Sequence, residues 1–487
     1  MDHTTAPLLA AVAEYHHLGR YGFTPPGHRQ GRGVDDRVLS ALGADAFRSD
    51  ILASPGLDDR LARGGVLAEA EELMADAVGA DSAFFSTCGS SLSVKAAMMA
   101  VAGGQDGGLL VARDSHKSIV AGLIFSGVCP HWITPRWDTE RHLSHPPSPA
   151  QVEQAWRENP HAAGALIVSP SPYGTCADIR GIAEVCHARG KPLIVDEAWG
   201  AHLPFHPDLP TWAMDVGADV CVVSVHKMGM GFEQGSVFHL QGDLVDPVRL
   251  RGCADLLMTT SPNVLIYAAL DGWRRQMVEF GHDLLGQALA SANRARTELA
   301  EITDISVMHD ELLGVEASHD LDLLQVLVDV ADTGTTGYAA ADWLREHRRL
   351  DVGLSDHRRV LATISPVDDT STIDALVDGV ALWRAGLDHP NPVQIRLPSP
   401  EELQLESVML PRDAFFAPAE AVPAERAAGR IAAEQITPYP PGIPAIVPGE
   451  RIDGAVVDYL CDGVAAGMNV PDASDPQLRT FRVVRAS

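Results

Sequence analysis

A repeated pattern of short apolar runs constrains the fold of this chain more than any other feature. Between about residues 61 and 285, runs of β-forming apolar residues alternate with longer helical patterns. Each run is almost continuously apolar, which is typical of strands buried on both faces of a mainly parallel sheet. The alternation predicts an α/β layer fold. The predicted strands are 82–87, 108–112, 164–169, 192–198 and 219–225, and two predicted helices are 91–102 and 179–190.

The remaining sequence predicts further segments around this α/β region. Helical and strand patterns alternate again at 288–302, 304–309 and 358–365, which indicates smaller α+β domains. A proline-rich stretch at 389–400 reads as a linker. The predicted segments are an N-terminal lead-in at 1–60, a large domain at 61–288, a small α+β domain at 289–390 and a C-terminal domain at 391–487.

Charge and cysteine content exclude several classes of function. The formal net charge of −28 argues against nucleic acid or an anionic membrane as the partner, because both would be repelled. The seven cysteines are scattered and include no C-x-x-C pair, which predicts reduced thiols in a cytoplasmic protein. The N-terminus lacks a basic region typical of a signal peptide, and no apolar run reaches the length of a membrane span. His202 and His206 flank Pro204 without a completing ligand pattern, so we predict no metal site.

Polar residues follow two of the predicted strands near the start of the α/β region. Ser90 and Ser91 come after Gly89 at a strand-to-helix turn, where backbone N–H groups and hydroxyls could hold a phosphate. An ordinary helix N-cap is an equal alternative for these serines. His116 follows the run at 108–112, at the strand end where ligands bind in open α/β sheets. Its imidazole could stack on a planar ring, or it could be a solvated loop histidine.

Two further strand ends carry a carboxylate and a lysine. Asp196 ends a very apolar strand, and a buried carboxylate is costly unless it meets a cation. A protonated pyridine nitrogen would serve as that cation and would make the ring an electron sink. Lys227 follows the run at 219–225, together with Ser224 and His226. A lysine beside groups that can anchor a phosphate suits an imine to an aldehyde cofactor, for which its pKa must be lowered.

The motifs together resemble the bacterial ornithine/lysine/arginine decarboxylases. The resemblance spans nearly the whole chain and is strongest to the short arginine decarboxylases that lack an N-terminal wing domain. It implies the aspartate-aminotransferase-like fold, which is pyridoxal-phosphate (PLP) fold type I. The matching motifs are PGH at 26–28, STCGSS at 86–91, RDSHKS at 113–118, SPSPYG at 169–174, DEAWG at 196–200, SVHK at 224–227 and PYPPGIP at 438–444.

The resemblance implies a role for each of these residues. Lys227 would bind the aldehyde of pyridoxal 5′-phosphate, Asp196 would pair with the pyridine nitrogen, and His116 would stack on the ring. The family also implies a homodimer with active sites at the subunit interface, and a higher oligomer is possible. The phosphate and the rest of the cofactor would contact Ser90, Ser91, Ala198, Ser224 and His226, and the substrate candidates are Trp199, Glu233 and Glu434.

The reaction that this resemblance implies is decarboxylation of a basic amino acid, in polyamine supply or in a specialised pathway. Arginine is the first expected substrate, followed by lysine or ornithine. The alternatives are an aminotransferase, a decarboxylase of an unusual amino acid, and a non-catalytic relative. Departures from the family pattern at 57–61, at 172–173 and at Glu233 weaken the substrate assignment and leave the cofactor residues untouched.

Overall fold

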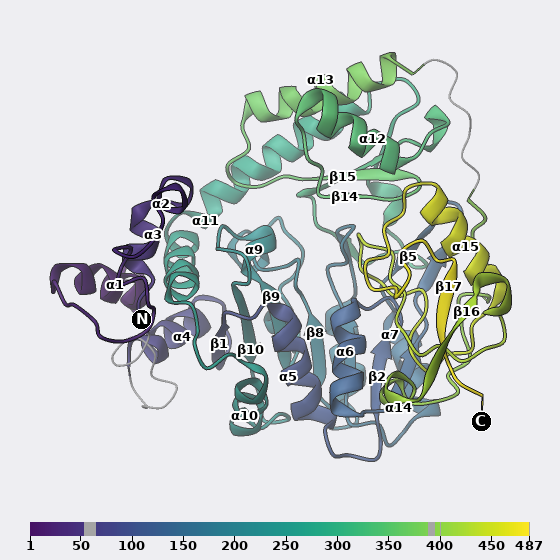
Figure 1. The fold of residues 1–487 in the computed structure, drawn as a ribbon, viewed down its shortest axis with the longest axis horizontal. Helices are drawn as coiled ribbons and strands as arrows, with labels where there is room; N and C mark the ends of the chain where they lie inside the picture. Colours follow the sequence, from purple (N-terminus) through teal and green to yellow (C-terminus); the bar gives the residue numbers. More distant parts are fainter. Residues whose placement is uncertain (53–64, 388–394, 400, 487) are drawn as a thin grey trace. The chain divides into compact units, whose positions relative to one another are not determined.

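The computed structural model describes residues 1–52, 65–387, 395–399 and 401–486 (Figure 1). These residues form two compact units, each assembled from separate stretches of the chain. The units cut across the four predicted segments, whose boundaries stay a prediction. The departure at 57–61 and most of the predicted linker lie outside the described residues. The first unit comprises 1–101, 192–207 and 211–282, and the second comprises 102–191, 208–210 and 283–487.

Four of the seven strands of the large sheet belong to the first unit, in the order β1-β10-β9-β8. Strands β8 and β9 run parallel, while β10 is antiparallel to both β9 and β1. Strand β1 therefore runs in the same direction as β8 and β9, so the carboxyl ends of these three strands share one edge. The strands are β1 (Ser82–Ser86), β8 (Leu193–Asp196), β9 (Val220–Ser224) and β10 (Ser236–Leu240).

The helices of the first unit include the N-terminal helix, which is held in place by a buried carboxylate. Asp271 accepts a hydrogen bond from the Leu8 N–H at 2.9 Å and pairs with Arg274 at 2.9 Å. The helices are α1 (Pro7–His17), α2 (Asp36–Leu42), α3 (Ala44–Ser49), α4 (Val66–Ala77), α5 (Ser90–Ala102), α9 (Val225–Met228) and α10 (Pro247–Leu257), with short turns at Leu203–Phe205 and Ala213–Val216; α11 (Val264–Leu299) begins in this unit and ends in the second.

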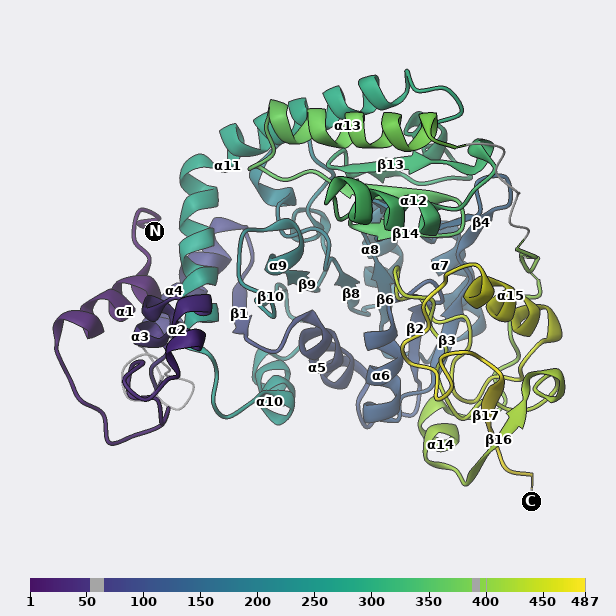
Figure 2. The ribbon, with the colours of Figure 1, turned by 45° about the horizontal axis from the view of Figure 1, so that its top comes forward.

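The second unit contains parallel strands of the large sheet and a separate antiparallel sheet. Strand β2 pairs in parallel with both β3 and β6. The antiparallel sheet has the order β11-β13-β15-β14, and α13 lies over it in Figure 2. The strands are β2 (Leu109–Ala112), β3 (Pro130–Ile133), β4 (Arg136–Asp138), β5 (Leu143–His145), β6 (Ala165–Val168), β7 (Thr175–Cys176), β11 (Ser306–Met308), β12 (Asp320–Leu321), β13 (Gln325–Asp329), β14 (Leu354–Ser355), β15 (Arg359–Thr363), β16 (Ala419–Pro423) and β17 (Thr480–Val484).

The C-terminal part of the second unit has a hydrophobic core of its own. Val456, Leu460 and Phe481 are buried there, where the amphipathic helix α15 packs against the β16-β17 pair. Helix α14 contacts α6, and Arg412 donates a hydrogen bond to the Phe125 carbonyl at 3.0 Å. The helices of the second unit are α6 (Lys117–Ser126), α7 (Pro149–Glu158), α8 (Ile179–His187), α12 (Gly337–Trp343), α13 (Thr370–Ala385), α14 (Pro411–Phe416) and α15 (Gly454–Ala465), with short turns at Asp310–Leu312, Ala331–Thr333, Leu344–Arg348 and Ala424–Arg426.

The five predicted strands of the α/β region are confirmed as β1, β2, β6, β8 and β9, and the fold class is α/β as expected. All residues of β2, β6, β8 and β9 are buried, which explains their continuous apolar runs. The predicted helices are α5 and α8; α8 ends at His187, and Gly190 adopts a positive φ of 63° just beyond it. The sequence did not reveal β10, because a short strand between glycines resembles a loop.

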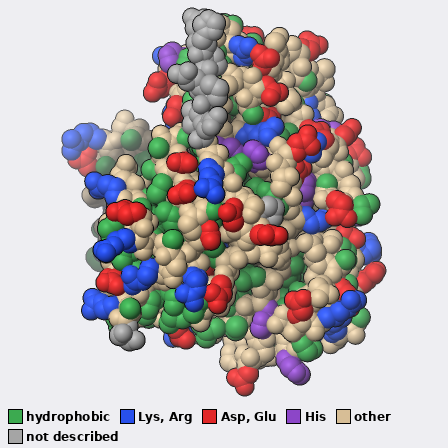
Figure 3. All heavy atoms as spheres, turned by 90° about the vertical axis from the view of Figure 1, so that its right-hand side faces the viewer, with side chains coloured by type: hydrophobic (Ala, Val, Ile, Leu, Met, Phe, Trp, Pro, Cys, Tyr) green, Lys and Arg blue, Asp and Glu red, His purple; other side chains and the backbone are tan. Residues whose placement is uncertain are grey.

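The surface carries charges of both signs. On the face shown in Figure 3, acidic and basic side chains lie interspersed with hydrophobic ones. Among the described residues, no helix combines the length and the apolar character that crossing a bilayer would require.

Candidate active site

Two serine hydroxyls meet at the edge where β1 and β9 end. The sheet register aligns Ser86 with Ser236 and Ser236 with Ser224, so the two strand ends are level. Ser224 Oγ donates a hydrogen bond to Ser90 Oγ at 2.6 Å, and Ser90 begins α5. Gly89 has a positive φ of 73°, which allows the tight turn into the helix. The hydroxyl pair and the helix N-terminus form a place that suits a phosphate.

A lysine and a buried carboxylate lie in the same unit. Burial lowers the pKa of Lys227, although the attraction of Asp196 and Glu233 opposes this shift. Burial also raises the pKa of Asp196 to about 6, against the attraction of Lys227 and a hydrogen bond from the Ala198 N–H at 3.2 Å. In both groups burial favours the neutral form, whereas the attraction between them favours the charged forms. Lys227 Nζ lies 4.4 Å from the centre of the Trp199 ring.

His226 and Glu233 lie beside this lysine. His226 Nδ1 is 3.1 Å from the Gly235 carbonyl oxygen, to which it donates, so Nε2 is the ring atom left to face another group. Glu233 approaches that Nε2 at 3.8 Å, but 89% of its side chain is exposed. The departure from the family pattern at Glu233 is thus a solvent-facing carboxylate next to a predicted phosphate ligand.

His116 belongs to the second unit, where it caps α6. Its Nδ1 accepts a hydrogen bond from the Ser118 N–H at 3.2 Å and lies 2.9 Å from Ser118 Oγ. An acceptor at Nδ1 places the proton of the neutral imidazole on Nε2. The stacking of His116 on a cofactor held by Lys227 stays a prediction.

Glu434 occupies a structural position in the C-terminal core. Its Oε2 accepts the Ser474 N–H at 2.7 Å and its Oε1 accepts the Arg482 N–H at 2.6 Å. The residue is only 6% exposed. These two bonds hold the C-terminal segment against the turn before 436, and a contact of Glu434 with substrate stays a prediction.

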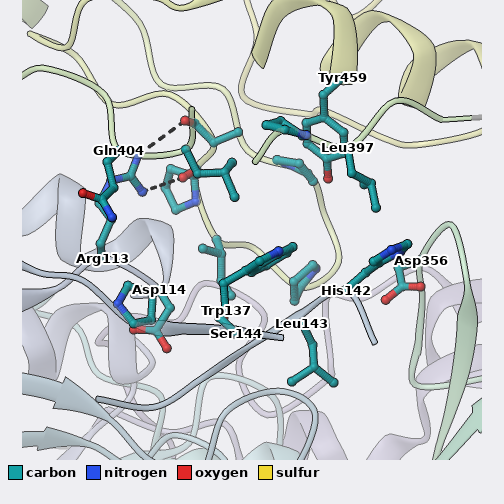
Figure 4. A pocket seen from close by; sticks show the side chains of 18 of the residues that line it. Arg113, Asp114, Trp137, His142, Leu143, Ser144, Asp356, Leu397, Gln404 and Tyr459 are labelled. Atoms are coloured by element: carbon teal, nitrogen blue, oxygen red, sulfur yellow. Dashed lines mark hydrogen bonds between the residues drawn. The ribbon is translucent and has the colours of Figure 1, made fainter. Parts of the chain in front are cut away.

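A cavity of about 420 Å³ lies within the second unit (Figure 4). Arg113 closes one side through hydrogen bonds to the carbonyls of Pro444 at 2.7 Å and Ala445 at 3.3 Å, and the Tyr459 hydroxyl projects inward. Asp356 is already paired, since it accepts the Tyr173 hydroxyl at 3.0 Å. Many of the side chains that line the cavity carry rings, and these are Trp132, Trp137, His142, Tyr173, Tyr338, His357, Tyr459, Pro135, Pro398, Pro438, Pro440, Pro441 and Pro444.

Asp114 predicts a pH dependence of stability. Burial raises the pKa of this carboxyl to about 7 from an ordinary value of 3.8. A raised folded-state pKa stabilises the protein at low pH, and this stabilisation is lost as the pH rises through about 7. We expect Asp114→Asn to remove up to about 4 kcal/mol of this pH dependence between pH 4 and 8.

Chemical denaturation of the cofactor-free protein at several pH values measures this effect as the difference between wild type and variant. Asp106→Asn, a change at an exposed carboxylate, is the control and should leave the pH profile unchanged. Equal profiles for wild type and Asp114→Asn would contradict the prediction.

The ion pair between Arg113 and Glu450 predicts a large effect on stability. Arg113 donates to both oxygens of Glu450 at 3.2 and 3.1 Å, and the Glu450 side chain is 2% exposed. Removing one partner of a buried pair leaves an uncompensated charge. We expect Glu450→Gln to lower the free energy of unfolding by about 3 kcal/mol. Glu406→Gln, in the exposed pair with Arg451, should show no measurable loss in the same denaturation experiment.

The residues of the first unit fit pyridoxal 5′-phosphate. The Ser90 and Ser224 hydroxyls and the start of α5 suit its phosphate. Asp196 suits a protonated ring nitrogen, because this buried carboxylate needs a cation, and Lys227 supplies an amine with a lowered pKa. Together with the α/β sheet, these groups define a PLP-dependent enzyme of fold type I.

The chain belongs to the Orn/Lys/Arg decarboxylase family. The family's major domain matches residues 6–322 and its C-terminal domain matches residues 401–471. The chain is a decarboxylase with an amino acid as its small-molecule substrate, and its cofactor is pyridoxal 5′-phosphate. This confirms the family, the enzyme class and the cofactor that the sequence predicted.

Similar proteins cover the chain almost completely. An arginine decarboxylase of Halalkalibacterium halodurans is 36% identical, with 98% of this chain and 97% of that protein covered. An arginine decarboxylase of Bacillus subtilis is 34% identical, with 100% and 99% covered. The solved structure of the E. coli constitutive lysine decarboxylase has a TM-score of 0.82 at 20% identity and covers 99% of this chain but 82% of that longer chain. The last likeness shows the shared fold.

Sequence reasoning missed the residues that surround His116 in the second unit. Arg113 and Lys117 belong to the matching motif RDSHKS at 113–118, but the sequence alone predicts no function for either side chain. Both contact the C-terminal domain, Arg113 through Glu450 and Lys117 through Asp472 at 2.7 Å. The only available signal was that this motif and PYPPGIP at 438–444 occur in the same family.

Proposed function

We propose that this chain removes the carboxylate of L-arginine as CO2 and releases the corresponding amine, with lysine or ornithine as the next substrates. The observation that carries the proposal is the 36% and 34% identity, over nearly full length, to two proteins named arginine decarboxylase. The lysine and carboxyl of the first unit support it, since pyridoxal-phosphate-dependent decarboxylation uses an amine for cofactor attachment and a charge opposite the ring nitrogen.

The proposed cofactor contacts follow the geometry of each unit. The hydroxyls of Ser90, Ser91 and Ser224 would hold the phosphate, with His226 beside them as a further contact. Asp196, oriented by the Ala198 N–H, would hold a proton on the ring nitrogen. His116 would stack on the ring, and its Nδ1 is already fixed by Ser118.

The chemistry supplied by bound pyridoxal 5′-phosphate is an electron-withdrawing ring, which stabilises the electron pair left at the α-carbon when CO2 departs. With its carboxylate charged, Asp196 would stabilise a proton on the ring nitrogen of the bound cofactor. The lowered pKa of Lys227 favours the neutral amine that acts as nucleophile. Once protonated, Lys227 Nζ can return a proton to the α-carbon, and the Trp199 ring shields this nitrogen from water on one side.

Trp199, Glu233 and Glu434 are the proposed substrate contacts. The Trp199 face is suited to a cationic side chain as well as to Lys227. Glu233 is exposed and could attract the distal cation of the substrate. Glu434 is the weakest of the three candidates, because both of its oxygens already accept backbone hydrogen bonds.

We further propose a cytoplasmic homodimer with its active sites at the subunit interface. No disulfide joins any of the seven cysteines, which all lie in the described part of the chain, and this agrees with the reducing compartment that the sequence predicts. The homodimer rests on the resemblance to the family. Sedimentation of the PLP-loaded protein should give a dimer or a multiple of it, and a monomer with full activity would contradict this assembly.

A substrate panel tests the proposed reaction. Protein loaded with pyridoxal 5′-phosphate is incubated with arginine, lysine or ornithine while CO2 and amine are measured. We expect both products with each active substrate and the highest kcat/KM for arginine. Higher kcat/KM for lysine or ornithine would overturn only the substrate preference. Turnover that requires a keto acid and releases no CO2 would instead indicate an aminotransferase.

A further inference from the structure

We propose that the loop at 438–445 of the C-terminal domain sets the orientation of the His116 ring, with Gly442 as the positioning residue. This inference rests on the proposed function of His116 as the ring that stacks on the cofactor. Its basis is a set of contacts within the second unit that join this loop to residues on both sides of His116.

The contact between Gly442 and His116 leaves no room for a side chain. Gly442 has a φ of +90°, and a Cβ placed on it would lie 2.8 Å from His116 Cδ2 and 3.0 Å from His116 Nε2. This edge of the imidazole therefore rests against the glycine backbone. The opposite edge, at Nδ1, is held by Ser118. With both edges held, the tilt of the ring is determined, and with it the direction of the face that would stack on the cofactor.

The loop is bound to the chain immediately before and after His116. The Lys117 N–H donates to the Gly442 carbonyl at 2.9 Å. On the other side, Arg113 donates to the carbonyls of Pro444 and Ala445. The loop is closed on itself by the Gly442 N–H, which donates to the Pro438 carbonyl at 3.0 Å. The segment that carries His116 and the loop that touches its ring are thus joined by one backbone hydrogen bond and by two hydrogen bonds from the Arg113 guanidinium.

The Lys117 side chain adds a second connection to the C-terminal domain. Lys117 Nζ lies 2.7 Å from Asp472 Oδ1 and 5.1 Å from the centre of the Tyr439 ring. The other Asp472 oxygen accepts a hydrogen bond from Gln435 Nε2 at 2.8 Å. Asp472 therefore holds the Lys117 side chain from a segment that follows the loop in the sequence.

Two glycine substitutions separate ring positioning from backbone strain. Gly442→Ala places a methyl group against the His116 ring. Gly429→Ala is the matched control, because Gly429 has a similar φ of +80° in the same domain but no neighbouring atom within 4 Å of an added Cβ. Both variants bear the strain of a side chain at positive φ. Only Gly442→Ala should move the ring.

The first measurement is the ¹³C-histidine NMR spectrum of the cofactor-free protein, with the His116 signal identified by its loss in His116→Asn. We expect this signal to shift in Gly442→Ala and to stay in place in Gly429→Ala. The second measurement is the Kd of pyridoxal 5′-phosphate, which we expect to rise roughly three- to tenfold in Gly442→Ala only, the size of a lost ring-stacking contact.

Asp472→Asn provides a second variant if Gly442→Ala does not fold. It releases Lys117 without adding an atom near His116, and it should shift the His116 signal and raise the Kd of pyridoxal 5′-phosphate in the same direction. An unmoved His116 signal, or a moved signal with an unchanged Kd, would overturn the positioning role. Failure of the proposed function would look different, since the wild type would then release no CO2 from any basic amino acid while the NMR result stood.

Discussion

Replacing Lys227 by alanine is expected to lower kcat/KM for decarboxylation by roughly 10²- to 10⁴-fold, the contribution of a group that both attacks and transfers a proton. The variant should also lack the visible absorption of a cofactor bound covalently to lysine. The reason is that burial lowers the pKa of Lys227, so this amine is prepared to act as a nucleophile.

Lys95→Ala is the matched control for this experiment. Burial also lowers the pKa of Lys95, which lies within α5 and is not a proposed cofactor or substrate contact. The control should keep the visible absorption and most of the activity. Borohydride reduction of the wild type should fix the cofactor to Lys227, and fixation to another lysine would refute this assignment.

Replacing Asp196 by asparagine is expected to lower kcat roughly 10²- to 10³-fold, as loss of a preorganised electrostatic contact does. The same variant should change how cofactor affinity depends on pH. In the wild type, burial raises the pKa of Asp196 to about 6, so the carboxylate is charged above this pH and neutral below it. Affinity for pyridoxal 5′-phosphate should therefore weaken in the wild type as the pH falls through about 6.

The Asp196→Asn variant should lack this step, because asparagine does not titrate. Titrations that follow cofactor fluorescence at pH 5 to 8 give the Kd of pyridoxal 5′-phosphate for both proteins. Protonation of the cofactor itself affects both Kd values equally and cancels in their ratio. Asp243→Asn, at an exposed position, should behave as the wild type does. If the affinity of Asp196→Asn for pyridoxal 5′-phosphate fell as much near pH 6 as that of the wild type, another group would govern the pH dependence.

The sequence allowed the strand ends to be placed because buried parallel strands have a recognisable composition. Asp196 and Ser224 end strands in which every residue is buried, so both could be located from the apolar runs alone. The level ends of β1 and β9 depend on β10, which lies antiparallel between them and was not predicted. Because β10 is antiparallel to both neighbours, β1 and β9 run in the same direction, and their carboxyl ends still lie at the same edge of the sheet.

Contacts made across long stretches of chain could not be predicted in the same way. His116 and Gly442 are neighbours only through the tertiary fold, and no local pattern indicates that the glycine has no space for a Cβ. Glu434 illustrates the reverse case, because the family resemblance suggested a substrate contact whereas its two oxygens accept backbone hydrogen bonds. A carboxylate in a motif does not by itself reveal which partner it meets.

The pairing of Arg113 with the 444–450 stretch has a consequence for building chimeras of related decarboxylases. A C-terminal domain transplanted alone would bring its own loop and its own equivalent of Glu450 to a foreign Arg113 and His116. The Arg113–Glu450 ion pair and the close approach of Gly442 to His116 both join residues 113–118 to the C-terminal domain. Residues 113–118 should therefore be exchanged together with that domain. These two parts lie far apart in the sequence, so a single crossover just before the C-terminal domain would separate them.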